Sequence, residues 1–442
     1  MAPAPDPFEG SSGLPEHADV VVIGGGIIGV CTAHSLAERG VSVVLVEKGE
    51  IGAEQSSRNW GWCRQMGRDP REIPLIVESL TMWRTMNERV GGETGFRTSG
   101  ILYTATTDKE LEERADWLKY AREYQLDSHI VSGEKVTELL PGSTLKFKGA
   151  LYTPTDGRAE PTRAAPAIAR AAAAKGAFIA RRCAARGIER SAGRVSAVVT
   201  ERGTVRTGNV VLAGGAWSRL FAGNAGVYFP QLKVINSVMR SVPFDAGFDT
   251  SASGGGFAVR KRLDGGYTIA QQHLSIVDIV PDSFKLLLTF WPALKHDPWS
   301  LRFRVGKTFV KEASFAKRWQ LDQETAFERV RVLDPEPINW VLDDAMKKLE
   351  RAFPAFKGLP IAERWAGAID VTPDAVPVIS EVDGHPGFFI ASGFSGHGFG
   401  LGPGAGRLMA DLVTGKPPLV DPSPFRYKRL IDGTKPQLIA GF

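Results

Sequence analysis

The chain has 442 residues, of which 43% are hydrophobic and 23% are charged. This composition excludes a disordered protein, and the length is sufficient for two packed domains. The formal net charge is +5, but the basic residues are spread along the chain, so they do not form the basic stripe typical of nucleic-acid binding. The three isolated cysteines, Cys31, Cys63 and Cys183, exclude a disulfide framework and show no zinc-binding spacing. We therefore expect no nucleic-acid partner and no metal.

Residues 1–17 are rich in proline, glycine and serine, and they lack the basic start and apolar core of a signal peptide. We expect a disordered leader here. No apolar run reaches the roughly 18–20 residues that a membrane span requires. The sequence therefore predicts no transmembrane segment and a cytoplasmic location.

A β-α-β unit follows this leader. Residues 19–23 and 41–46 are short β-branched runs typical of buried parallel strands. Residues 30–39 have the apolar spacing of a helix, and a glycine ends it. This order of elements is typical of a dinucleotide-binding domain.

The turn between the first strand and the helix carries the spacing Gly24-x-Gly26-x-x-Gly29, and Glu47 ends the second strand. Gly24 permits a tight turn, Gly26 lets the backbone approach a pyrophosphate, and Gly29 allows close helix–strand packing. Glu47 can accept hydrogen bonds from ribose hydroxyls, which favours FAD or NAD over NADP.

The middle of the chain shows further elements. Helical patterns cover residues 72–90, 108–124 and 162–175, antiparallel strands are expected over 188–206, and a buried strand over 209–213. From about residue 234 to 332 the sequence is richer in β-branched and aromatic residues, which predicts a separate sheet-based domain.

A second glycine-rich segment, residues 393–404, lies between an apolar strand at 387–392 and a helix expected to begin at Pro403–Gly404. An NAD dehydrogenase has no need of such a loop. Backbone N–H groups and a helix N-terminus can stabilise the negative charge of a reduced isoalloxazine, so the segment favours FAD. The alternative is a loop that is rich in glycine for packing alone.

These motifs together resemble the superfamily of D-amino-acid oxidase, glycine oxidase and sarcosine oxidase, which are FAD-dependent amine oxidoreductases. The resemblance covers about residues 18–424 and is strongest in DVVVIGGGIIGV…VVLVEKGEIG, VVLAGGAWS, WAGAIDVTPDAVPVIS and ASGFSGHGFGLGPGAGRLMADLV. It implies an α/β fold with a Rossmann-like FAD domain and a second, mixed-sheet α+β substrate domain. We expect the FAD domain over 18–96, 155–225 and 366–424, the substrate domain over 97–154 and 226–365, and a C-terminal tail over 425–442.

The glycine motif and the resemblance together define a set of FAD-binding residues. Ala185 matches an adenine contact, and residues 396–399 would line the flavin pyrimidine. The cysteine that tethers the flavin in monomeric sarcosine oxidases matches Gly367, and no histidine lies near Ser57, so the resemblance implies non-covalent FAD. The full set is Gly24, Gly26, Ile27, Ile28, Gly29, Glu47, Lys48, Ser56, Ser57, Arg58, Ala185, Gly214, Gly215, Trp217, Gly396, His397, Gly398 and Phe399.

The substrate site departs from that of glycine oxidase. The arginines that hold the carboxylate there match Ile369 and Gly396 here. The segment SRNWGWCR resembles sarcosine oxidases instead, where its last arginine, Arg64 in this chain, grips the carboxylate. A guanidinium suits bidentate carboxylate recognition. We place Arg260 and Tyr267 near the substrate as well.

The resemblance implies hydride transfer from the carbon next to nitrogen to flavin N5, giving an imine that hydrolyses. The substrate would be an amino acid or N-substituted amino acid. His397 serves either proton transfer or positioning. Alternatives are oxidation of another small substrate such as a 2-hydroxy acid, and an FAD-binding subunit of a larger dehydrogenase complex.

The electron acceptor is either oxygen or a carrier such as a quinone. The lysines that promote reaction with oxygen in sarcosine oxidases match Thr268 and Gly400, which weakens the case for an efficient oxidase. The sequence leaves oxidase, dehydrogenase and oligomeric state open.

Residues 282–319 combine aromatic, lysine and arginine residues. Such a segment can lie on a membrane surface or a partner. We expect instead an elaboration of the substrate domain that buries these aromatic side chains.

Overall fold

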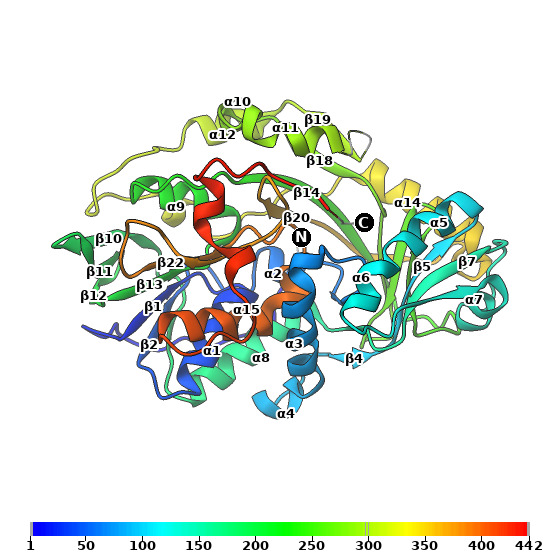
Figure 1. Cartoon of the computed structure of the whole chain (residues 1–442), viewed down its shortest axis with the longest axis horizontal. Coiled ribbons are helices and arrows are strands. Elements are labelled where there is room, and N and C mark those ends of the chain that lie inside the picture. The colour runs from blue at the N-terminus through cyan, green and yellow to red at the C-terminus, as the bar shows by residue number, and fades with distance from the viewer. Residues whose placement is uncertain (1–2, 297, 299, 440–442) are drawn as a thin grey trace.

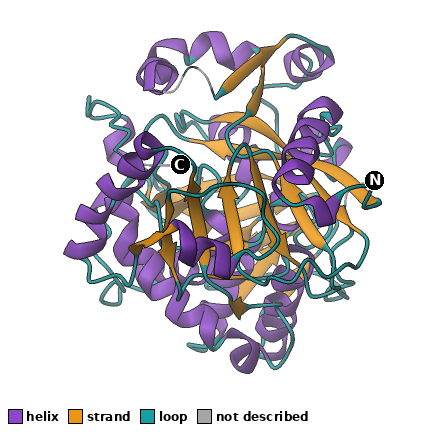
Figure 2. Cartoon of the chain, turned by 90° about the vertical axis from the view of Figure 1, so that its right-hand side faces the viewer, coloured by secondary structure: helices purple, strands orange, loops and turns teal. Residues whose placement is uncertain are grey.

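The computed structural model describes residues 3–296, 298 and 300–439, and Figure 1 shows how they are arranged. The first two residues of the expected leader, two residues of the 282–319 segment and the last three of the tail lie outside the described residues. Two large sheets dominate the described chain, one of six strands and one of ten. Figure 2 shows the strands in the interior and most helices around them.

The six-stranded sheet contains the predicted β-α-β unit. β1 lies between β13 and β2 with parallel pairing on both sides, and only β21 is antiparallel to its neighbour. β-branched runs form these strands because both faces of the sheet are covered. In spatial order the strands are β21 (Val378–Glu381), β22 (Phe388–Ser392), β13 (Asn209–Leu212), β1 (Val20–Ile23), β2 (Val43–Val46) and β9 (Phe178–Ala180).

Four helices share one hydrophobic core on one side of this sheet: α1 (Ile27–Ala37), α3 (Ile73–Arg84), α8 (Pro161–Ala174) and α15 (Gly398–Val413) (Figure 1). A second core contains side chains of β10 (Ala185–Ser191), β11 (Arg194–Thr200), β12 (Gly203–Arg206) and α9 (Ser218–Asn224). β11 pairs antiparallel with both β10 and β12, which confirms the antiparallel strands expected over 188–206.

Helix α15 begins at Gly398, earlier than the predicted start at Pro403–Gly404. Its glycines explain the difference, because they allow α15 to pack closely on its neighbours. A Cβ built on Gly402 would lie 2.8 Å from Ile27 Cγ1, and one on Gly406 would lie 2.6 Å from Cys31 Cβ. The glycines within this helix therefore serve packing, which was the alternative explanation of the glycine-rich segment. Gly396, before the helix, lines the cavity described below.

The ten-stranded sheet forms the second domain. Its core is covered by α14 (Asn339–Ala352), whose apolar face packs on the sheet. The spatial order is β19 (Leu301–Arg304), β18 (Ser275–Asp278), β14 (Leu232–Ser241), β17 (Tyr267–Ala270), β16 (Phe257–Lys261), β15 (Ser251–Gly254), β5 (Ile101–Ala105), β7 (Gly149–Thr153) and β6 (His129–Ser132), and β20 (Ile361–Val371) pairs with β14.

The domain boundary expected between residues 365 and 366 falls inside β20. This strand pairs antiparallel with β14 over Leu232–Ser241, yet its last residues reach the first sheet's ligand cavity described below. A small sheet of β3 (Trp62–Cys63), β8 (Gly157–Arg158) and β4 (Arg97–Thr98) also joins segments assigned to both domains. The two units are thus connected through continuous strands.

Two of the predicted helices are interrupted. The pattern over 72–90 forms α3 and then α4 (Met86–Val90), and the pattern over 108–124 forms α5 (Asp108–Asp116) and then α6 (Leu118–Glu123). Helix α7 (Gly133–Leu139) packs on β7 of the same domain.

The described part of the leader is packed rather than disordered. The backbone N–H of Asp6 donates to the carbonyl of Thr162, and that of Ser11 donates to the carbonyl of Ile179. Phe8 is buried in the core of α1 and α8. The expectation failed because Phe8 and Leu14, two isolated apolar side chains in a segment rich in proline and polar residues, give no periodic signal.

The segment 282–319 does not bury all of its aromatic side chains. It forms α10 (Pro281–Lys285), α11 (Leu287–His296) and α12 (Lys307–Ala313), which lie with β19 at the top of Figure 1. Phe284, Trp291 and Phe303 are 66%, 48% and 55% exposed, and Leu288 is 88% exposed. The prediction of burial is wrong for these side chains.

Within the described residues, no helix combines the length and apolarity that crossing a membrane requires. The same residues contain no group of histidine, cysteine and acidic side chains that could hold a metal ion.

Candidate active site

Two cavities meet between the domains. The first cavity runs along the carboxyl ends of β1, β2 and β13, where the strand–helix turns of this sheet lie. Ligands bind at this edge of doubly wound sheets. The predicted residues that line it are Gly24, Gly26, Ile27, Ile28, Glu47, Lys48, Ser56, Ala185, Gly214, Gly215, Trp217, Gly396, Gly398 and Phe399.

Four residues of the predicted set do not line the first cavity. A Cβ on Gly29 would lie 1.9 Å from the carbonyl oxygen of Gly24, so Gly29 serves close packing, as its place in the motif predicts. Ser57 donates to the carbonyl of Glu54. Arg58 is buried against Asp334 and the carbonyl of Ala366, and it lines the second cavity. His397 also lines the second cavity only.

Glu47 lies where a ribose-binding acid is expected. Its carboxylate accepts the backbone N–H groups of Gly25 at 2.7 Å and Gly49 at 2.6 Å, which fixes the acid beside the glycine motif. Burial raises the pKa of Glu47 above its ordinary value, although Lys48 and these two N–H groups oppose the shift. Hydrogen bonds from two hydroxyl groups would favour the ionised form further.

The sequence did not identify several residues of the first cavity. Phe327 and Arg331 come from the segment assigned to the substrate domain, and no local motif marks them. Asp370 lies at the end of β20, where its carboxylate accepts the N–H of Gly393 at 2.6 Å. This contact connects the glycine-rich segment to β20. Asp370 lies 23 residues before Gly393, so no local spacing in the sequence indicates it.

The second cavity has a volume of about 770 Å³ and lies against the ten-stranded sheet. It has walls from β14, β18, α11 and the segment around Arg64. Five residues line both cavities and therefore mark their junction: Gln55, Asn59, Ile369, Gly396 and Phe399. A cofactor in the first cavity would meet a substrate in the second at this point.

Arg64 lies in the wall of the second cavity and is 8% exposed. One guanidinium nitrogen donates to the carbonyl of Met66, and the guanidinium carbon lies 5.5 Å from the centre of the Tyr103 ring. Asp156 holds this turn, because its carboxylate accepts the N–H of Gln65 at 2.8 Å. The predicted anchor therefore lines the second cavity from a position that its neighbours hold in place.

Arg68 is a second buried arginine in the same wall, and the sequence analysis did not single it out. A Cβ on Gly400 would lie 3.4 Å from Arg68 Nη2, so this guanidinium occupies the space beside a position where the resemblance expects lysine. Burial and the neighbouring Arg64 lower the pKa of Arg68 to about 10. A pKa of about 10 keeps Arg68 cationic at neutral pH.

Glu72 and His397 form a buried pair at the same wall. His397 Nδ1 lies 2.7 Å from Glu72 Oε2, and Arg68 Nη1 lies 3.9 Å from the same oxygen. Burial raises the pKa of Glu72, but His397, Arg68 and Arg64 outweigh burial and hold it below its usual range. Burial lowers the pKa of His397, and Glu72 opposes this only in part.

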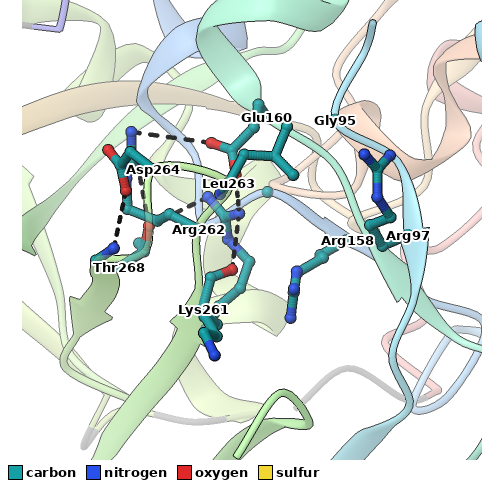
Figure 3. A network of polar contacts seen from close by, with 12 residues as sticks. Gly95, Arg97, Arg158, Glu160, Lys261, Arg262, Leu263, Asp264 and Thr268 are labelled. Carbon is teal, nitrogen blue, oxygen red and sulfur yellow. Dashed lines mark hydrogen bonds and ion pairs between the residues drawn. The ribbon is translucent and has the colours of Figure 1, made fainter. Parts of the chain in front are cut away.

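Arg260 and Tyr267 lie away from both cavities, contrary to expectation. Arg260 donates to Glu160 at 2.8 Å, to the carbonyl of Trp60 at 2.6 Å and to Thr268 at 3.1 Å. Figure 3 shows the polar network around Glu160, Arg262, Asp264 and Thr268. The hydroxyl group of Tyr267 donates to the carbonyl of Phe248 inside an aromatic core. Both side chains already have structural partners.

Comparison with known proteins agrees with this geometry. A family model described as "FAD dependent oxidoreductase" (DAO) matches residues 19–412. The structure of L-amino acid deaminase from Proteus myxofaciens in complex with anthranilate is 36% identical, with a TM-score of 0.93 and coverage of 97% of both chains.

Two relatives differ in how much of their own length the match covers. Glycine oxidase of Pseudomonas aeruginosa is 27% identical over 92% of this chain and 97% of its own length. Mitochondrial sarcosine dehydrogenase of Mus musculus is 26% identical over 92% of this chain but 41% of its own length. The chain therefore spans about two fifths of that longer relative.

The residues of the first cavity fit FAD. Gly24 and Gly26 leave its wall free of side chains at the start of α1, where N–H groups favour a pyrophosphate. A Cβ on Gly24 would lie 2.4 Å from the carbonyl oxygen of Ala213, so the tight turn requires glycine there. At the other end, Gly398 begins α15 beside the junction of the cavities, where the helix N-terminus suits a reduced flavin.

We expect Gly26→Val to abolish FAD binding while leaving the fold intact. Its Cβ would lie 3.1 Å from Ser56 Oγ, and the two further methyl groups would enter the first cavity. FAD content per chain, read from the visible absorbance of the purified variant, checks this. Gly208→Val is the matched control, because a Cβ there meets open space. Full FAD occupancy in folded Gly26→Val would contradict the assignment.

Proposed function

This chain belongs to the DAO family of FAD-dependent oxidoreductases, and from this premise we propose that it oxidises the C–N bond of an α-amino acid or N-substituted amino acid. When bound, FAD accepts the two electrons and the hydrogen that leave the substrate. The product is an imine, which water hydrolyses. The relatives named for sarcosine, glycine and L-amino acids support this choice of reaction.

One observation carries the proposal: two buried arginines, Arg64 and Arg68, lie in the wall of a cavity that adjoins the flavin site. Burial and the charge of Arg64 lower the pKa of Arg68, and Glu72, Tyr103 and Asp156 oppose this shift only in part. A substrate carboxylate would relieve this repulsion and make paired hydrogen bonds. We assign Arg64 as the main anchor and Arg68 as its support.

The rest of the second cavity favours a bulky apolar side chain on the substrate. Its volume of about 770 Å³ far exceeds what glycine or sarcosine requires. The anthranilate complex of the similar deaminase contains an aromatic carboxylate, in agreement with this choice. The apolar side chains in the wall include Trp60, Trp62, Val238, Val277, Ile279, Phe290, Leu294 and Val371.

The FAD should be bound without a covalent link. Gly367 stands where the resemblance expects the tethering cysteine of sarcosine oxidases, and glycine has no thiol to form the bond. We expect acid or heat treatment to release intact FAD into the supernatant, as measured by its fluorescence and chromatographic retention. Yellow colour that stays with the denatured chain would refute non-covalent binding.

Two other functions make different predictions. A 2-hydroxy acid has the same carboxylate but no nitrogen, and a non-catalytic FAD-binding subunit needs a partner to be reduced. Anaerobic mixing of the purified protein with phenylalanine, leucine and their 2-hydroxy analogues separates these cases. Bleaching of the flavin by the amino acids but not by the hydroxy acids supports the proposal. Bleaching by the hydroxy acids but not by the amino acids contradicts it.

Arg64→Ala should lower kcat/KM for amino acids by about 100-fold or more and leave FAD content unchanged. Truncating a charged group in a desolvated site costs roughly 2–5 kcal/mol. Arg64→Lys should recover only part of this loss, because a point charge cannot make the paired contact. Arg170→Ala, at an exposed site, is the control. Wild-type kinetics in Arg64→Ala would indicate that Arg68, and not Arg64, holds the carboxylate. Loss of FAD from this variant would indicate that Arg64 belongs to the cofactor site.

We expect slower turnover with oxygen than with an artificial electron-acceptor dye. Thr268 and Gly400 stand where sarcosine oxidases have lysine, and Thr268 hydrogen-bonds Arg260 away from the cavities. A carrier or quinone would then be the physiological acceptor. Parallel assays of oxygen consumption and dye reduction at saturating amino acid test this, and equal rates would count against it.

A further inference from the structure

We propose that His397 is the base that removes a proton from the substrate ammonium group, and that Glu72 positions its ring for this step. The inference rests on the proposed function, since an amino acid arrives with a protonated nitrogen at neutral pH. Oxidation of the C–N bond requires the nitrogen lone pair. The chain must therefore accept one proton before the electrons leave.

The position of His397 makes it the candidate. It precedes α15 as the N-cap residue, and its neighbours Gly396 and Phe399 line both cavities. Its ring lines the second cavity and is 13% exposed, which leaves it accessible from that side. A substrate held by Arg64 and Arg68 in the same wall would bring its nitrogen close to this junction.

Glu72 decides which ring nitrogen is available. The carboxyl is fully buried on the 3₁₀ turn before α3, and its lowered pKa keeps it ionised. An ionised carboxylate can only accept a hydrogen bond, so Nδ1 of His397 carries the hydrogen and donates it. In a neutral ring the lone pair is then on Nε2, the nitrogen that Glu72 does not hold.

The surrounding charges keep the ring neutral until substrate binds. The charged groups near the ring are Arg64 and Arg68, on the loop between β3 and the 3₁₀ turn, and Glu72 on that turn. Burial and the two arginines lower the pKa of His397, and Glu72 partly opposes them. A bound carboxylate would neutralise the arginine charges. The ring would then be a stronger base with substrate present than without it.

The step balances without any further reactant. The ammonium N–H bond breaks, and its proton joins His397 Nε2, giving an imidazolium that Glu72 stabilises. The amine regains its lone pair. Its C–N bond is then oxidised by the FAD that the proposed function assigns, and the histidine returns its proton to water after the imine has left.

The test is the pH dependence of anaerobic flavin reduction at saturating phenylalanine. In the wild-type protein the rate should be high above the pKa of His397 and should fall as pH drops through it. In His397→Gln the rate at pH 7 should fall by about 10²–10⁴-fold. It should then rise tenfold per pH unit, because only substrate that is already deprotonated reacts.

Glu72→Gln distinguishes positioning from packing. It keeps the shape of the side chain but removes the anion that raises the pKa of His397. The midpoint of the pH profile should therefore move to lower pH, which a purely structural contact would not cause. A second readout is the ¹⁵N spectrum of histidine-labelled holoenzyme, where His397 should show a protonated Nδ1 and an unprotonated Nε2 at pH 8.

The controls separate this proposal from the proposed function. His129→Gln changes an exposed histidine and should leave the profile unchanged. Binding of 3-phenylpropanoate, which lacks the nitrogen, should be similar in His397→Gln and wild type. If no amino acid reduces the wild-type flavin, the proposed function fails. If wild type is reduced and His397→Gln keeps the same pH profile, or the Nε2 tautomer is observed, the base assignment fails.

Discussion

Close packing of helix on helix is the constraint on which the site depends. Helix α15 approaches α1 so closely that side chains at Gly402 and Gly406 would collide with Ile27 and Cys31. This contact fixes the N-terminus of α15 beside the glycine motif of α1, although the two segments are far apart in sequence. Because the loop before α15 begins at the end of β22, its residues are held at the junction of the two cavities.

The same packing buries a small set of charges that would be costly if they were unpaired. Glu72 contacts both His397 and Arg68, and among the described residues its Oε1 and Arg68 Nη1 have no hydrogen-bond partner. Unsatisfied buried donors and acceptors are uncommon in folded proteins, and those that occur are explained by strain, by a catalytic role, or by a water or ion that completes the network. The wall of the second cavity therefore brings two arginines, a glutamate and a histidine together, although the histidine lies more than 300 positions from the others in the chain.

Local signals located the main strands and the glycine motif of the cofactor half of the molecule. The β-α-β unit, Glu47 and the strand before the second glycine-rich segment lie where their patterns predict, because a parallel strand buried on both faces and a glycine turn each constrain a few consecutive residues. The substrate half gave weaker signals. Arg260 and Tyr267 are polar residues in a β-rich segment, a pattern that also occurs in active sites. In the folded chain their hydrogen bonds go to Glu160 and to the carbonyl of Phe248 instead.

The sequence by itself determined the family, the cofactor and many of the residues that line the first cavity, since these depend on glycines and acids at short, fixed spacings. Only the tertiary structure decided which arginines line the second cavity. Arg64 and Arg68 lie in its wall, whereas Arg260 is held by Glu160, a hundred positions away in the chain. The tertiary structure likewise brought Glu72 to His397, 325 positions later in the chain. A hydrogen bond between such remote residues leaves no periodicity or spacing to read, and burial, which sets the charge of both groups, exists only once the helices have packed.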